Sequence, residues 1–175
     1  MPTQETTERD FRRSRWGDSQ HQVLLVELGQ PAVNNDETLA WDTTMVGFSC
    51  LVAYTFADNR LVSGGYLFDD PDDGMDGVVY TRLSESLTAK YGDVAEHIQW
   101  LNPIRRVNVE TIGDLGNAAG AHYLSANRYW QTATQNIALR LVPKDGEYGA
   151  QVLLTYHERP ANKGYSPAVT DLNLL

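Results

Sequence analysis

The sequence predicts an α+β domain in which an antiparallel sheet has two helices packed on one face. In two stretches, residues 19–28 and 78–91, the apolar residues indicate a helix. Shorter stretches rich in aromatic and β-branched residues follow each of them. This order is also compatible with two helix-plus-meander blocks. Since 175 residues suit one domain with a core that needs no staples, we expect a flexible arm over 1–10, a single domain over 11–159 and an extended or disordered tail over 160–175.

The first predicted helix begins after Ser19. Ser19 and Gln22 have the spacing of a capping box, in which each side chain bonds the other residue's backbone. Gly29 is typical of the residue that follows a helix end. The wide apolar face, which includes Val23–Val26, predicts that this helix lies against a sheet.

A hairpin formed by residues 48–56 and 61–68 follows a strand over Leu39–Asp42. Asp58 and Asn59 lie between the two hairpin strands, and both residue types tolerate left-handed backbone. Two glycines at positions 64 and 65 predict a bulge or the close approach of a helix.

The second helix is indicated by apolar residues at helical spacing and by Gly92, which is typical of a helix end. Residues 98–111 are ambiguous, and residues 115–125 are compatible with a helix or a strand. The predicted C-terminal strands are 128–132, 137–142 and 151–156.

The charge balance disfavours several classes of partner. Fourteen basic and 23 acidic residues give a net charge of −9, which repels phosphate backbones and anionic lipid, so we expect no nucleic-acid binding. No apolar run reaches the roughly 20 residues that span a bilayer. Because residues 1–10 contain no apolar signal segment, we expect a cytoplasmic protein, or a periplasmic or envelope protein if a signal was removed.

One acidic loop is a candidate binding site. Its five carboxylates could collect a cation such as Ca²⁺, contact a basic partner, or form a solvated loop before the second helix. The spacing does not match an EF-hand. The residues are Asp69, Asp70, Asp72, Asp73 and Asp76.

Two further groups are candidates for surface recognition. Four arginines, at positions 9, 12, 13 and 15, could grip phosphate or an acidic partner, or they could pair with the protein's own acidic surface or be solvated. Tyr66, Tyr129 and Trp130 could line an open sheet face that docks another protein, because aromatic residues give large contact area at low entropy cost.

Patterns for catalysis and for cofactors are weak. The four histidines have no partner at metal-ligand spacing, no phosphate-binding loop occurs, and there is no Gly-x-Ser-x-Gly nucleophile elbow. Cys50 is alone and in a strand, so we expect a buried, inert thiol. We therefore expect no catalytic residues, no metal ligands and no cofactor.

The segment Phe11-x₄-Trp16-Gly17-x-Ser19-x₃-Val23 resembles a pattern in small bacterial proteins. The helix start is similar to that of outer-membrane assembly lipoproteins of the SmpA/OmlA type, which belong with the β-lactamase-inhibitor-protein-like folds. The resemblance implies an α+β fold and a binding or scaffolding role, and it supplies no catalytic residues.

From these observations we expect a non-enzymatic protein-binding module of inhibitor, immunity or accessory type. Its acidic loop or its aromatic sheet face would contact a protein partner, with a basic partner favoured by the loop. Two alternatives stay open: an enzyme whose site is assembled from dispersed residues, and a structural accessory protein of an envelope or phage particle.

Overall fold

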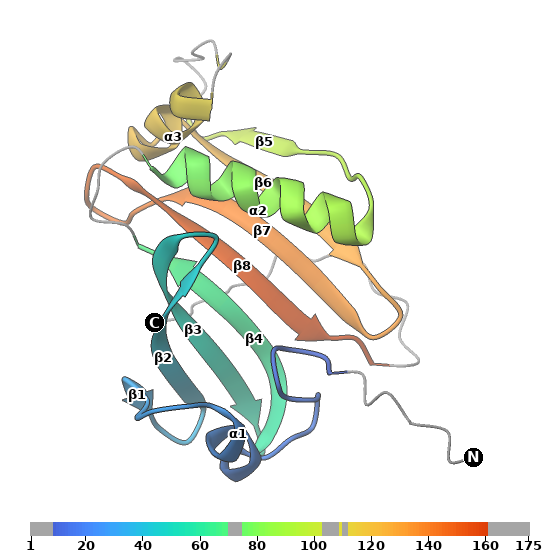
Figure 1. The fold of residues 1–175 in the computed structure, drawn as a ribbon. Helices are drawn as coiled ribbons and strands as arrows, with labels where there is room; N and C mark the ends of the chain where they lie inside the picture. The colour runs from blue at the N-terminus through green and yellow to red at the C-terminus, as the bar shows by residue number, and fades with distance from the viewer. Residues whose placement is uncertain (1–8, 70–74, 103–108, 110–111, 161–175) are drawn as a thin grey trace.

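The computed structural model describes residues 9–69, 75–102, 109 and 112–160. Within these residues eight strands form one antiparallel sheet in the order β1-β2-β3-β4-β8-β7-β6-β5 (Figure 1). The strands are β1 (Val33–Asn34), β2 (Thr38–Met45), β3 (Phe48–Ala57), β4 (Arg60–Phe68), β5 (His97–Trp100), β6 (Leu124–Gln131), β7 (Gln135–Pro143) and β8 (Ala150–Glu158).

The strand order divides the sheet into two four-stranded meanders that meet where β4 pairs with β8. Helix α1 (Gln20–Val26) precedes the first meander and helix α2 (Asp76–Tyr91) precedes the second. Helix α3 (Ile112–Gly120) is inserted between β5 and β6. An α+β fold with an antiparallel sheet is therefore confirmed. The described residues contain three helices, whereas the sequence predicted two.

One face of the sheet carries the buried apolar side chains of both meanders. Val52, Tyr66 and Leu154 are cross-strand partners in β3, β4 and β8, and directly paired residues project to the same side. Val52 belongs to a cluster with Phe11 and Val23, whereas Leu154 belongs to a larger cluster that includes α2 and α3 side chains. Because Tyr66 contacts both clusters, it joins the two parts of the core.

The helix ends follow the local sequence signals. Ser19 and Gln22 form the predicted capping box at the start of α1. The helix ends at Val26, slightly before the predicted limit, and Glu27 is its C-cap. The C-cap of α2 is Gly92, with a φ of 94° that favours glycine. Residues 115–125 contain the end of α3 and the start of β6, so each alternative holds for part of the segment.

The predicted hairpin is present as β3 and β4. Asp58 and Asn59 have φ values of 50° and 57°, the left-handed geometry of a two-residue hairpin turn. A Cβ on Gly64 would collide with the Phe11 ring, so this glycine permits the close approach of the N-terminal segment. Most of the predicted arm and tail, residues 1–8 and 161–175, lies outside the described residues, and the domain limits stay a prediction.

Among the described helices, none is both long enough and apolar enough to cross a lipid bilayer.

Candidate functional site

The acidic loop is described only at its two ends. The Asp69 carboxylate lies 2.6 Å from the Lys144 ammonium, and this hydrogen bond raises the pKa of Lys144. Asp76 is the first residue of α2 and is buried. Asp70, Asp72 and Asp73 lie outside the described residues, so their predicted contact with a cation or a basic partner stays a prediction.

The three aromatic residues of the predicted docking platform do not share a face. Trp130 is buried, and its indole N–H donates to the Gly92 carbonyl at 2.9 Å. Its cross-strand partner Ile137 lies in the larger core cluster, to which Tyr66 also belongs. Tyr129 is exposed on the other side and stacks against His97. A common platform was wrong because neighbours in a strand point to opposite faces.

An ion pair between the partly exposed Arg12 and the buried carboxylate of Glu27 joins the N-terminal segment to the end of α1. The Arg12 guanidinium makes two hydrogen bonds to the Glu27 carboxylate, at 3.0 and 3.2 Å. The Glu27 side chain is only 6% exposed, and the Tyr54 hydroxyl from β3 donates to the same carboxylate. Burial and the Glu27 contact raise the pKa of Tyr54, so this hydroxyl stays protonated and can donate. The prediction that the arginines pair with the protein's own carboxylates therefore holds for Arg12.

A second polar cluster lies at the matching place in the other half of the molecule. Arg128 on β6 pairs with Glu96 at 3.5 Å and with Asp93 at 3.7 Å, just beyond the end of α2. Burial, with the nearby Glu96 charge, raises the pKa of Tyr80 on α2. Both clusters join the segment that covers the sheet to a strand, so we assign them a structural role.

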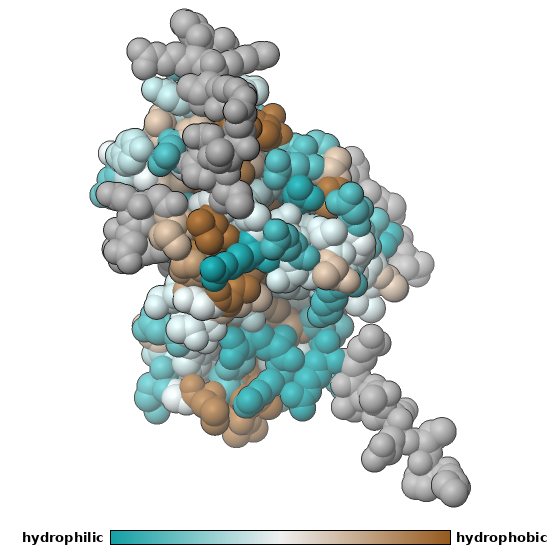
Figure 2. Space-filling view, turned by 45° about the horizontal axis from the view of Figure 1, so that its top comes forward, coloured by the Kyte–Doolittle hydropathy of each residue, from teal (hydrophilic) through white to brown (hydrophobic). Residues whose placement is uncertain are grey.

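The outward side of α1 is the most exposed apolar feature of the described residues. Leu24, Leu25 and Leu28 are 38%, 71% and 81% exposed. Leu24 and Leu25 lie on the side of α1 away from Val23, which points inward and is fully buried. Leu28 follows the C-cap residue Glu27, whose backbone is extended, so it extends the apolar surface just past the helix end. Figure 2 shows hydrophobic side chains gathered at the lower end of the molecule, where Figure 1 places α1. We call Leu24, Leu25 and Leu28 the α1 leucine patch.

An exposed arginine lies beside the α1 leucine patch. The Arg13 guanidinium donates to the Val26 carbonyl at 3.2 Å, which places a positive charge at the C-terminal end of α1. Hydrophilic side chains border the hydrophobic group in Figure 2. The C-terminal end of α1 therefore combines apolar side chains with a positive charge.

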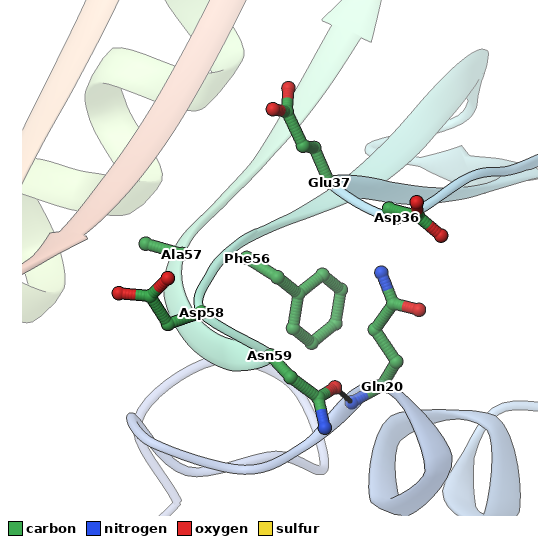
Figure 3. A pocket seen from close by; sticks show the side chains of 7 residues that line it. All are labelled: Gln20, Asp36, Glu37, Phe56, Ala57, Asp58 and Asn59. Atoms are coloured by element: carbon green, nitrogen blue, oxygen red, sulfur yellow. Dashed lines mark hydrogen bonds between the residues drawn. The ribbon is translucent and has the colours of Figure 1, made fainter.

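A shallow polar pocket of about 580 Å³ lies next to the start of α1 (Figure 3). The backbone N–H of Gln20 donates to the Asn59 side chain across it, and the Gln20 side chain donates to the Asn35 carbonyl. The carboxylate of Glu37 points away from the Phe56 ring at the centre of the view. These contacts join α1 to two turns and brace it. The pocket is lined by Gln20, Asp36, Glu37, Phe56, Ala57, Asp58 and Asn59.

The reactive side chains are placed for packing. Cys50 is buried, as predicted, and burial raises the pKa of its thiol to about 11. Burial lowers the pKa of His157, which favours a neutral imidazole. In the part of the chain that the structure describes, no three His, Cys, Asp or Glu side chains come together as a possible metal site.

Comparisons with known proteins add no further assignment. No family model, curated protein or solved structure matches the chain, so no functional residue is transferred to it. The α1 leucine patch was missed because the run Val23–Val26 was assigned to the core as a whole. The available signal was the width of the apolar face, since a helix of two turns cannot bury Val23 and Leu25, which lie on opposite sides, against one sheet.

Proposed function

We propose that this protein is a non-catalytic binding module that docks another protein through the α1 leucine patch. The supporting observation is the exposure of Leu25 on α1 and of Leu28 just past its end, while the other side of the helix packs against the sheet through Val23. Leaving large apolar side chains in water is unfavourable, and contiguous exposed apolar groups commonly mark interaction sites.

The attachment of α1 supports a role in recognition. A helix of seven residues is marginal in water, but here the capping box, Val23 and the Arg12–Glu27 pair hold it in place. A surface that is fixed before binding loses little conformational freedom when a partner arrives. The leucines are thus presented in one geometry, which favours specific docking.

The test compares capture by the wild-type protein and by a Leu25→Ser/Leu28→Ser variant, with quantitative mass spectrometry of co-purified proteins. The matched control is Leu101→Ser, which removes an exposed leucine, 44% exposed, far from α1 in the fold. We expect one partner whose recovery falls about tenfold or more with the patch variant and is unchanged with the control.

The captured partner must also bind the purified protein, measured by calorimetry, with the same ranking of variants. Circular dichroism and urea unfolding establish that the patch variant is folded, because exposed positions contribute little to stability. Equal recovery with all three proteins would contradict the proposed function.

A further inference from the structure

We infer that the partner of the α1 leucine patch is an acidic amphipathic helix, an inference that rests on the proposed function. Such a helix would place apolar side chains against Leu24, Leu25 and Leu28 and carboxylates beside the neighbouring arginines. Leu24 and Leu25 project from the outward side of α1 and Leu28 continues the apolar surface past the helix end, which gives a short strip that the apolar face of a partner helix can cover.

The segment 9–29 differs in charge from the chain as a whole, and the carboxylates of Asp36, Glu37 and Asp58 lie beside the start of α1, at the other end of the helix from Arg13. Residues 9–29 contain four arginines and three carboxylates, within a chain whose net charge is −9. All three carboxylates already accept hydrogen bonds inside the segment. Asp10 accepts from the backbone N–H of Trp16, Asp18 accepts from the backbone N–H of Arg15, and Glu27 accepts from the Arg12 guanidinium.

Two arginines of the segment remain available to a partner. Arg13 and Arg15 are exposed, and no ion pair with a described carboxylate engages either of them. Arg13 lies at the Val26 carbonyl, one residue from Leu25 along the chain. An acidic helix that crosses the leucines therefore meets a guanidinium at the C-terminal end of α1.

A protein helix fits this surface better than a membrane does. Two leucines on a helix of seven residues and one just past its end give a small apolar area, comparable with the anchor of a helix in a groove.

The probe is a fluorescein-labelled synthetic helix of about 20 residues with leucines on one face and glutamates beside them. A second probe carries lysine in place of every glutamate. We expect fluorescence anisotropy to show that the wild-type protein binds the glutamate probe about tenfold tighter than the lysine probe, and that salt weakens this preference.

Three variants separate the contributions. Leu25→Ser/Leu28→Ser should abolish binding of both probes, and Arg13→Gln/Arg15→Glu should weaken the glutamate probe about tenfold and improve the lysine probe. Lys90→Glu, which changes an exposed charge on α2 away from the patch, should leave both unchanged.

The outcomes distinguish the inference from the proposed function. If the leucine variant loses its captured partner while the arginine variant keeps it and neither probe discriminates by charge, the acidic helix is wrong and the docking patch stands. Binding to vesicles with about 30% anionic lipid, in place of the glutamate probe, would overturn the inference in favour of a membrane.

Discussion

The two halves of the molecule use the same strand pattern but cover it in different ways. In the second half the 16-residue helix α2 buries Val79, Tyr80, Leu83 and Leu87 against the sheet. In the first half α1 has seven residues and contributes Val23, while the non-helical segment before it contributes Phe11. The sheet of the first half is thus covered by few buried side chains, so each of them contributes a larger share of the stability of this half.

This difference explains why apolar side chains are exposed in only one of the two helices that start the halves. A long amphipathic helix uses its whole apolar face for the core, whereas α1 needs only Val23 for that purpose. Its Leu24 and Leu25 remain outside, and the ion pair of Arg12 with Glu27 supplies part of the attachment. The covering of the first half therefore leaves a surface that can bind a partner.

The largest expected effect comes from Phe11→Ala. Phe11 is 3% exposed and its ring contacts Tyr54, Tyr66 and Tyr156. Removing a buried phenylalanine leaves a cavity, so we expect a loss of about 3–5 kcal/mol in the free energy of urea unfolding. Hydrogen exchange should show that α1 also loses amide protection.

Leu87→Ala in α2 is the matched change in the other half. Val79, Tyr80 and Leu83 remain as anchors, so we expect α2 to keep its amide protection although the protein loses about 2–5 kcal/mol. If both variants leave their helices equally protected, the proposed contrast between few and many contacts is wrong.

The second comparison is between the two polar clusters, tested with Glu27→Gln and Glu96→Gln. The Glu27 side chain is 6% exposed and its change leaves Arg12 and Tyr54 with a weaker acceptor, so we expect a loss of about 2–3 kcal/mol. The Glu96 side chain is 30% exposed and water screens its pair with Arg128, so we expect less than about 1 kcal/mol. Equal losses in urea unfolding would show that burial does not set the strength of these pairs.

Local signals in the sequence predicted what local physics decides. The capping box at Ser19, the turn at Asp58-Asn59 and the helix end at Gly92 each depend on a few neighbouring residues, and all three are present. Strand β1 is too short to show an alternation of apolar and polar residues, and β5 lies in a stretch whose pattern Pro103 interrupts. The sequence therefore predicted neither strand.

Long-range arrangement was harder to predict because it depends on register and on partners far along the chain. The Arg12–Glu27–Tyr54 cluster joins a loop, a helix end and β3, and no spacing in the sequence relates them. The aromatic platform failed for a local reason, because Tyr129 and Trp130 are neighbours in β6 and point to opposite faces. That Tyr66 and Trp130 are the ones on the covered face depends on long-range pairing.

A smaller effect distinguishes the starts of the two helices. Ser19→Ala removes the side chain that accepts the Gln22 N–H, and we expect a loss of about 1 kcal/mol in thermal or urea unfolding. The N-cap residue of helix α2 is Met75, whose side chain makes no capping hydrogen bond. Met75→Ala is therefore the control, expected within about 0.5 kcal/mol of wild type. A loss at Met75 as large as that at Ser19 would contradict this assignment.

The smallest effect concerns the boundary between the halves, where His157 on β8 pairs with Ser63 on β4. Burial lowers the pKa of His157 below the ordinary value of 6.5, so the unfolded chain takes up this proton first as the pH falls. The stability that the neutral imidazole contributes is therefore fully present above about pH 6.5 and is lost between that pH and the lower pKa of the folded state. We expect His157→Gln to unfold in urea with a weaker pH dependence from pH 7 to pH 5 than wild type. His21→Gln, which changes an exposed imidazole on α1, should keep the wild-type dependence, and a flattened profile in that variant instead would place the pH-sensitive histidine in the first half rather than at the boundary.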